Sequence, residues 1–347
     1  MKDVQESLEK ALIRDGWVLG TNTFIRTGNP FEWIDGDSST MKVIKQYSGV
    51  ISLVKWLLRF DEIYSTPEDL RLDEYEKVKN LYIDKLQSAF DFYAPFFPKA
   101  DFHKIAIEGL AKVRTTDFCF IKKFANYLPS DGISHVDIGP GLCSHSVYSL
   151  SEFNSKYIAL EAIPYTYQVQ RYFLRYVSQF WPYYLDVVEC ENFFLPQDYI
   201  TNEINENKKY KIIHLPSWNF QLLSSNSIDL ITATFMLNEI SEAGLLWIIA
   251  NSTQVLKKGG YFYIRDSEKF KPNRHNINYD KLLEIAGFEL VKRLNVQNRV
   301  NFHGIPRLYH KKTEISYTYK HLLDKCLGHF FTKSMDMKSL DIDEIKL

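Results

Sequence analysis

A glycine-containing loop in the middle of the chain is the first place where residue types and spacing suggest chemistry. The sequence HVDIGPGLCSHS, residues 135–146, is an apolar, β-branched run that ends in Gly139 and Gly141 and then continues in a helix-like pattern. Glycines after a strand let the backbone turn tightly and approach a ligand, and the following helix presents its N-terminus to it. The stretch therefore predicts a cofactor loop, although a plain turn after a strand can have the same pattern.

The residues around this loop bear on which cofactor it would hold. A dinucleotide fingerprint has glycine at its first, third and sixth positions, and counting from Gly139 the sixth residue is Ser144. Asp137 precedes the loop, where a carboxylate would oppose a pyrophosphate but can hold a cationic or hydroxyl-bearing ligand. A nicotinamide-dependent oxidoreductase thus stays open as an alternative, but a different cofactor is favoured.

The elements that must position this loop follow a Pro/Gly break at residues 128–132. Short β-branched runs then alternate with helical patterns. Such alternation predicts an α/β fold with a doubly wound, mostly parallel sheet and helices on both faces. Strands are expected at residues 135–139, 157–162, 211–216, 228–235, 260–266, 289–296 and 307–312, and helices at residues 144–153, 164–180, 241–258 and 278–288.

The domain organisation is predicted from the flanks of this region. Residues 1–128 carry mainly helical periodicity and are expected to form a helical N-terminal cap over the substrate. Residues 129–312 form the expected cofactor-binding catalytic domain, and residues 313–347 a C-terminal helical extension with a polar, charged tail.

Composition narrows the class of protein. The 347 residues are 45% hydrophobic and carry a formal net charge of -1, so no global field attracts a polyanion and nucleic acid is not the expected partner. The four cysteines are scattered without metal-ligand spacing, and the N-terminus has no signal-peptide core, so a cytoplasmic protein with free thiols is predicted. Apolar runs stay below the length of a membrane span, and a homodimer is a possible assembly.

The pattern acidic-x-Gly-x-Gly-x-Gly, present here as Asp137-x-Gly139-x-Gly141-x-Cys143, resembles motif I of the class I S-adenosylmethionine-dependent methyltransferases. The stretches YIALEA, HLPSWNF, SNSIDLITATFML and VLKKGGYFYIRD extend the resemblance over residues 130–312. It implies a seven-stranded Rossmann-like sheet and S-adenosyl-L-methionine as the cofactor. The cofactor-binding residues that it implies are Asp137, Gly139, Pro140, Gly141, Glu161, Ser217, Trp218, Asn219 and Phe235, with Glu161 on the ribose hydroxyls.

Two shorter stretches, EAIPYTYQVQRYFL and NEI, are similar to bacterial sugar O-methyltransferases associated with surface polysaccharides. That resemblance implies a sugar-type small-molecule acceptor. Its expected binding residues are Tyr165, Asn238, Arg265 and Asp266. A carboxylate pair at the end of the fifth strand could also hold a divalent metal, but such charges are usually solvated and no metal is predicted.

Methyl transfer to a sugar hydroxyl benefits from a general base. Glu239 follows the predicted fourth strand, His303 lies in a loop between the last two strands, and His145 begins the helix after the glycine loop. Each also has an interpretation without a catalytic role. Glu239 could be a charge at a helix N-terminus, His303 a surface histidine, and His145 a hydrogen-bonded histidine at the start of a helix.

Two other functional classes stay open. A nucleic-acid methyltransferase is disfavoured because FMLNEI stands where an amino-adenine enzyme has Asn/Asp-Pro-Pro-Tyr/Trp, and the charge is neutral. A methyltransferase fold that has lost catalysis and serves as a scaffold would fit Cys143 in place of the third glycine.

Overall fold

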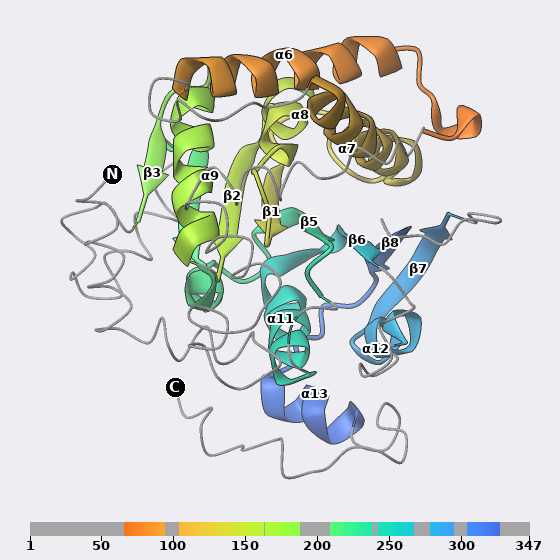
Figure 1. Ribbon diagram of the computed structural model, residues 1–347. Coiled ribbons are helices and arrows are strands. Elements are labelled where there is room, and N and C mark those ends of the chain that lie inside the picture. Colours follow the sequence, from red (N-terminus) through yellow and green to blue (C-terminus); the bar gives the residue numbers. More distant parts are fainter. Residues whose placement is uncertain are drawn as a thin grey trace, which may run out of the picture.

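The computed structural model describes residues 66–93, 104–162, 164–187, 209–237, 240, 242–266, 278–294 and 304–326. Its centre is an eight-stranded sheet with the strand order β3-β4-β2-β1-β5-β6-β8-β7 (Figure 1). The strands are β1 (Ser134–Ile138), β2 (Lys156–Glu161), β3 (Tyr184–Asp186), β4 (Ile212–Pro216), β5 (Ile228–Thr234), β6 (Leu256–Asp266), β7 (Phe288–Arg293) and β8 (Ile305–Lys311).

The sheet is mostly parallel, as predicted. Every neighbouring pair from β3 to β6 is parallel, whereas β8 runs antiparallel to both β6 and β7. The chain winds outward from β1 in one direction and from β5 in the other, so the topological switch point lies between these two strands, where ligands bind in folds of this type. The α/β, doubly wound Rossmann-like architecture is confirmed.

Two details differ from the expected sheet. The sequence pattern predicts seven strands, and the three-residue edge strand β3 adds an eighth beside β4. Helix α11 (Glu242–Val255) ends earlier than expected, and Gly259 and Gly260 lie within β6 instead of stopping the helix. An added Cβ at Gly260 would approach the Asp229 backbone oxygen to 3.1 Å, so this glycine allows β5 and β6 to pack closely.

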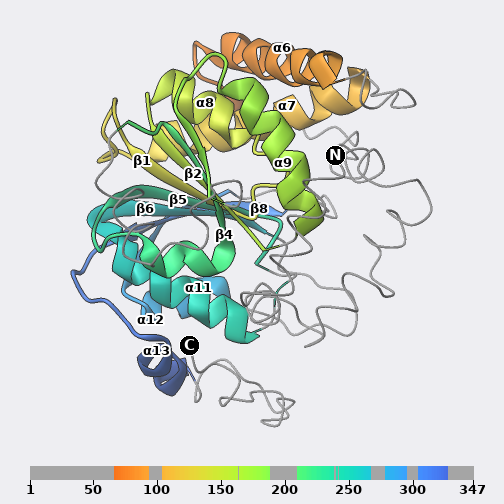
Figure 2. The ribbon, with the colours of Figure 1, turned by 90° about the vertical axis from the view of Figure 1, so that its left-hand side faces the viewer.

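Helices cover both faces of the sheet (Figure 2). One face carries α6 (Tyr75–Tyr93), α7 (Lys104–Phe124), α8 (His145–Glu152) and α9 (Pro164–Val177). The other carries α11, α12 (Tyr279–Ile285) and α13 (Tyr319–Cys326). The alternation of β1 serves both sides, because Val136 and Ile138 join the core under α11 while His135 and Asp137 point toward α7 and α8.

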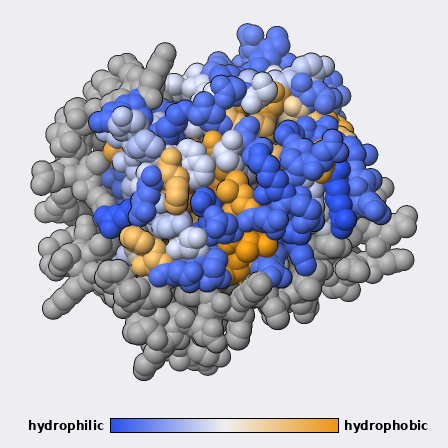
Figure 3. Space-filling view, turned by 90° about the horizontal axis from the view of Figure 1, so that it is seen from above, coloured by the Kyte–Doolittle hydropathy of each residue, from blue (hydrophilic) through white to orange (hydrophobic). Residues whose placement is uncertain are grey.

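Helices α6 and α7 belong to the predicted N-terminal cap, and they share one core with α8 and the sheet. The buried side of α6 is built from residues three or four apart, namely Tyr75, Val78, Tyr82, Leu86 and Phe90. The surface above α6 is mainly hydrophilic, with hydrophobic side chains gathered in a narrow band (Figure 3). The boundary at residue 128 stays a prediction, and residues 1–65 lie outside the described part of the chain.

The C-terminal helix α13 packs on α11 and α12. Leu322, Leu323 and Cys326 are buried in the core on that face of the sheet. Among the described residues, no helix combines the length and the apolar character that a membrane crossing requires.

Candidate functional site

The predicted cofactor loop lies at the switch point and has the backbone that its glycines allow. Gly139 and Gly141 have φ angles of 58° and 59°, in the left-handed region that glycine enters without strain. The Gly139 amide donates a 2.9 Å hydrogen bond to the Leu160 carbonyl, which holds the loop beside the end of β2. A Cβ at Gly139 would meet the Met236 side chain at 3.0 Å, so the site also lacks room for alanine.

Cys143 stands at the third glycine position and adopts the same conformation. Its φ is 55°, and its side chain is completely buried. Burial raises the pKa of its thiol well above the usual value, so the sulfur is neutral and shielded from solvent. The position therefore has a glycine-like backbone although it carries a cysteine.

Asp137 lies near the end of β1 and is fully buried among hydrogen-bond donors. Its Oδ1 accepts from the Thr232 hydroxyl at 2.7 Å, and its Oδ2 accepts from the Tyr157 hydroxyl at 2.7 Å and contacts His145 Nδ1 at 3.1 Å. Burial opposes ionisation of this carboxyl, but His145, His135 and the Thr232 hydrogen bond together outweigh burial and lower the pKa to about 2. Asp137 is thus an ionised anchor beneath the loop, and its contact with a cofactor stays a prediction.

Asp117, on helix α7, is the centre of a buried charged cluster that the sequence reasoning missed. Its Oδ1 accepts from the Tyr263 hydroxyl at 2.5 Å and from Arg265 Nε at 2.6 Å. Its Oδ2 accepts from Arg265 at 2.9 Å and contacts His145 Nε2 at 3.0 Å. Burial opposes its ionisation, yet the Arg265 guanidinium and the hydrogen bond to His145 hold the pKa of Asp117 well below its usual range.

Arg114, one helical turn before Asp117, ties α7 to the cofactor loop. Its Nε donates to the Ser144 hydroxyl and its NH1 to the Thr234 hydroxyl, both at 2.9 Å. Ser144 directly precedes α8, and Thr234 ends β5. The stretch RTTD contains the sequence signal for these contacts, since Arg114 and Asp117 stand three residues apart and therefore lie on the same face of α7.

His145 occupies the middle of this cluster, 1% exposed, with protein groups at both ring nitrogens. Nδ1 faces Asp137, while Nε2 lies 3.0 Å from both the Asp117 carboxylate and Arg114 NH1. Nε2 can donate to the carboxylate or accept from the guanidinium, but not both, because a carboxylate only accepts and a guanidinium only donates. This geometry favours a histidine that orients the loop over one that takes a proton from a substrate.

Glu161 ends β2 next to the loop, 4% exposed. Its Oε1 accepts from the Ala162 amide at 2.8 Å and its Oε2 from Gln170 at 2.6 Å. The Gln170 carbonyl in turn contacts His214 Nε2 at 2.9 Å. Burial lowers the pKa of His214 to about 3, so its neutral ring donates from Nε2 and fixes the orientation of the Gln170 amide.

The next predicted cofactor residues follow β4 in the short helix η4 (Ser217–Leu222). Ser217 is 3% exposed, and its hydroxyl has no hydrogen-bond partner among the described residues. Asn219 is 8% exposed in the same turn. The backbone of Trp218 belongs to η4, and its side chain lies outside the described residues. A buried donor without a partner is uncommon, so Ser217 is suited to a ligand.

Phe235 and Arg265 close the site at the ends of β5 and β6. Phe235 has a φ of 60°, which is unusual for an aromatic residue and is typical of functional positions. Its amide donates to the Arg265 carbonyl at 3.0 Å, and the Arg265 guanidinium lies 4.4 Å from the centre of its ring. Arg265 is 1% exposed and engaged with Asp117, so its predicted role in substrate binding would require part of this cluster to face the substrate.

The other predicted residues divide into buried and undescribed ones. Asp266 is fully buried at the end of β6, where its backbone would lie 2.7 Å from a Cβ on Gly304. Pro140 is buried in the loop. The backbone of Tyr165 belongs to α9, and its side chain lies outside the described residues, as do Asn238, Glu239 and His303 entirely. The structure therefore brings together the cofactor positions, and the two main candidates for the base stay predictions.

No protein-family model matches the chain, and no curated protein matches it. Among solved structures, it is similar to a SAM-dependent methyltransferase from Aquifex aeolicus, with 15% identity and a TM-score of 0.36, over 56% of this chain and 89% of that one. It is also similar to the 1,6-didemethyltoxoflavin-N1-methyltransferase of Burkholderia thailandensis, with 12% identity and a TM-score of 0.40, over 70% and 92% of the two chains. A third similar structure is a TehB-like SAM-dependent methyltransferase from Corynebacterium glutamicum, with 13% identity and a TM-score of 0.36, over 66% and 98%.

Proposed function

We propose that this protein is an S-adenosylmethionine-dependent methyltransferase that acts on a small molecule, with a sugar hydroxyl as the acceptor. The observation that carries the proposal is the pairing of Glu161 with the left-handed glycine loop at the switch point. A buried, oriented carboxylate at the end of β2 suits two ribose hydroxyls, and the glycines permit the backbone of the loop to approach the ligand closely.

The residues present fit this cofactor. Gly139 and Gly141 give the loop a left-handed backbone, and the buried hydroxyl of Ser217 lacks a partner among the described residues and is available to a ligand. Asp137 and Glu161 are buried carboxylates beside the loop, and their negative charge would suit a cationic cofactor. When bound, the cofactor supplies an electrophilic methyl group for an in-line displacement.

The chain's own residues then have three tasks. Glu161 holds the ribose, with Gln170 and His214 keeping its carboxylate in place. The cluster of Asp117, Arg114 and His145 orients the loop through Asp137 and Ser144. A general base must accept the proton of the acceptor hydroxyl, and Glu239 and His303 are its proposed candidates, with His145 assigned to positioning.

Cofactor binding is tested by isothermal titration with S-adenosylhomocysteine. We expect binding to the wild type and at least a tenfold higher Kd for Glu161→Gln, because the amide replaces one acceptor of the ribose hydroxyls by a donor. The matched control Glu284→Gln changes an exposed residue of α12 and should leave the Kd unchanged. Absence of binding to the wild type at high micromolar concentration would refute the enzyme proposal and favour a scaffold.

The acceptor is tested with labelled S-adenosylmethionine and a panel of nucleotide sugars, followed by mass detection of an added methylene unit. With a verified acceptor, Glu239→Gln and His303→Ala separate the two candidates for the base. A true general base contributes about 10²–10⁴-fold to the rate. If both variants turn over within about threefold of the wild type, neither residue is the base.

A further inference from the structure

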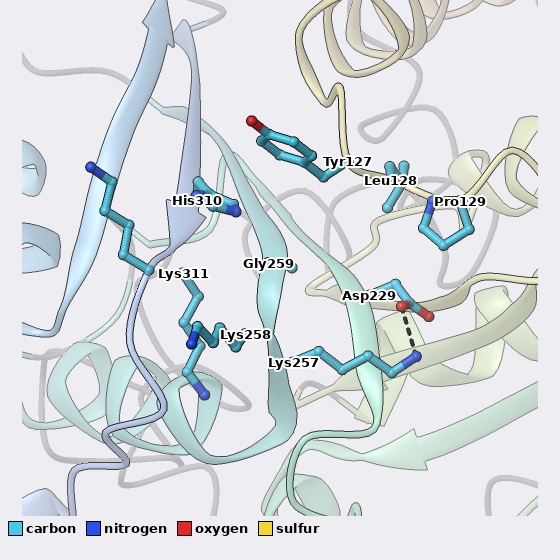
Figure 4. Close-up of a pocket in the computed structure, with 11 residues that line it drawn as sticks. Tyr127, Leu128, Pro129, Asp229, Lys257, Lys258, Gly259, His310 and Lys311 are labelled. Carbon is cyan, nitrogen blue, oxygen red and sulfur yellow. Dashed lines mark hydrogen bonds and ion pairs between the residues drawn. The ribbon is translucent and has the colours of Figure 1, made fainter.

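A pocket lies at the edge of the sheet opposite the cofactor loop. It has a volume of about 590 Å³ and is lined by the start of β6, the end of β8 and the connection from α7 to β1 (Figure 4). At a strand rise of about 3.3 Å per residue, Gly260 in this pocket is roughly 20 Å from Asp266 at the other end of β6. The volume is in the range of small-molecule sites, and the pocket is separate from the cofactor site.

The charged residues in the lining of this pocket are mostly basic. They are Lys257, Lys258, Lys311 and Lys312, with Asp229 as the acidic residue among them. Asp229 is already engaged, because its Oδ1 accepts from Lys257 at 2.7 Å and its Oδ2 accepts from the Ser134 amide at 2.8 Å. The buried Lys311 donates to the Thr253 and Leu256 carbonyls and closes the end of α11 instead of facing a ligand.

Two of these lysines can turn to a ligand. Lys258 lies 3.7 Å from Glu314 and Lys312 lies 2.6 Å from Glu289, and all four side chains are at least half exposed. Exposed ion pairs of this kind contribute little to stability. A phosphate group, which carries up to two charges and three acceptor oxygens, can therefore compete with Glu289 and Glu314 for the two ammonium groups.

An aromatic surface faces the same space. Figure 4 shows Tyr127 and His310 on one side of Gly259, with Lys257 and Lys258 on the other. The Tyr127 side chain is 76% exposed, its ring centre lies 5.6 Å from that of His310, and His310 Nε2 is buried without a hydrogen-bond partner among the described residues. An exposed aromatic ring near lysines can stack on a planar group of a ligand while the lysines bind a negatively charged group of the same ligand.

We propose that this pocket binds a small phosphate-bearing molecule with a planar ring, of the nucleotide class. Lys258 and Lys312 hold the phosphate, and the Tyr127 ring stacks on the planar group, with the His310 ring packed beside it. Because the site is a sheet length from the cofactor loop, its ligand is distinct from the cofactor and from the methyl acceptor.

The test titrates the full-length protein with adenosine 5′-diphosphate and with inorganic pyrophosphate, both in saturating S-adenosylhomocysteine to keep adenosine out of the cofactor site. We expect both to bind, the nucleotide at least fivefold more tightly. Lys258→Gln with Lys312→Gln should weaken both at least tenfold, and Tyr127→Ala should reduce the nucleotide to the affinity of pyrophosphate. The control Lys281→Gln removes an exposed, ion-paired lysine of α12 and should change neither.

Three outcomes overturn the proposal. The assignment of the binding site to this pocket is wrong if neither ligand binds at millimolar concentration. It is also wrong if the double lysine variant binds both ligands as tightly as the wild type does. The nucleotide class is wrong if pyrophosphate binds as tightly as the nucleotide. The pyrophosphate titration is repeated without S-adenosylhomocysteine. Its Kd does not depend on whether the protein binds S-adenosylhomocysteine, so this proposal and the methyltransferase proposal can fail independently of each other.

Discussion

Replacing Asp117 by Asn is the most direct test of the buried cluster that joins α7 to the cofactor loop. The carboxylate accepts from the Tyr263 hydroxyl and the Arg265 guanidinium and contacts His145, with none of its side chain exposed. An asparagine fits the same volume but brings no charge, and its amide nitrogen must face donors. The variant removes the carboxylate that pairs with the buried Arg265 guanidinium through two hydrogen bonds.

The size of the effect follows from this burial. Removing one partner of a buried ion pair typically destabilises a protein by about 3–5 kcal/mol, whereas exposed substitutions stay within about 0.5 kcal/mol. We therefore expect Asp117→Asn to lower the free energy of unfolding in urea by about 3–5 kcal/mol. The control Asp84→Asn, on the exposed side of α6 with 61% of its side chain exposed, should lie within about 0.5 kcal/mol of the wild type.

The pH dependence has a definite sign. The pKa of Asp117 is lowered in the folded protein, so its stabilisation is fully present above the unfolded value of about 3.9 and is lost as the pH falls toward the folded value. The difference between wild type and Asp117→Asn should be largest near pH 7 and shrink below pH 4.

A double variant separates the charge pair from simple loss of packing. Combining Asp117→Asn with Arg265→Met removes both charges, and a buried pair can be replaced by uncharged groups at little loss of stability. The loss in free energy of unfolding of the double variant should therefore be smaller than the sum of the two single losses by at least about 1 kcal/mol. A loss under about 1 kcal/mol for Asp117→Asn, or strict additivity in the cycle, would refute the cluster as an ion-paired unit.

Four further predictions concern the loop and its supports. Gly139→Ala should destabilise by roughly 1–2 kcal/mol in urea, because the left-handed φ and the Met236 contact both oppose a Cβ. Cys143→Gly should change stability by no more than about 1 kcal/mol, because relief of the left-handed φ offsets the loss of a small buried side chain, and the folded variant should react with a disulfide reagent to the same extent as the folded wild type. Gln170→Leu should raise the Kd for S-adenosylhomocysteine less than Glu161→Gln does; an equal or larger effect would contradict a supporting role. Asp137, whose pKa is lowered to about 2, should contribute roughly 2 kcal/mol at neutral pH that is lost between pH 4 and pH 2, so the stability difference between wild type and Asp137→Asn should narrow over that range.

The sequence by itself determined the central fold, because alternating β-branched and helical periodicities are local patterns that report which face is buried. The strand that ends at Ile138, the glycine loop and Glu161 all fall where these patterns and the resemblance to the methyltransferase loop placed them. The left-handed φ of Cys143 agrees with its place at a glycine position, which the spacing of the motif alone indicates.

Tertiary structure alone decided which polar groups meet. Asp117 contacts Arg265, which is 148 residues away in the sequence, and Arg114 contacts Thr234, which is 120 residues away. The periodicity of the sequence does not indicate such pairs. The edge strand β3 was missed for a related reason, since three residues are too few for an alternating pattern and the strand exists only by pairing with β4. Buried charges are stabilised by partners brought from distant elements, so the charged groups under the loop become evident only when α7 is packed on the sheet.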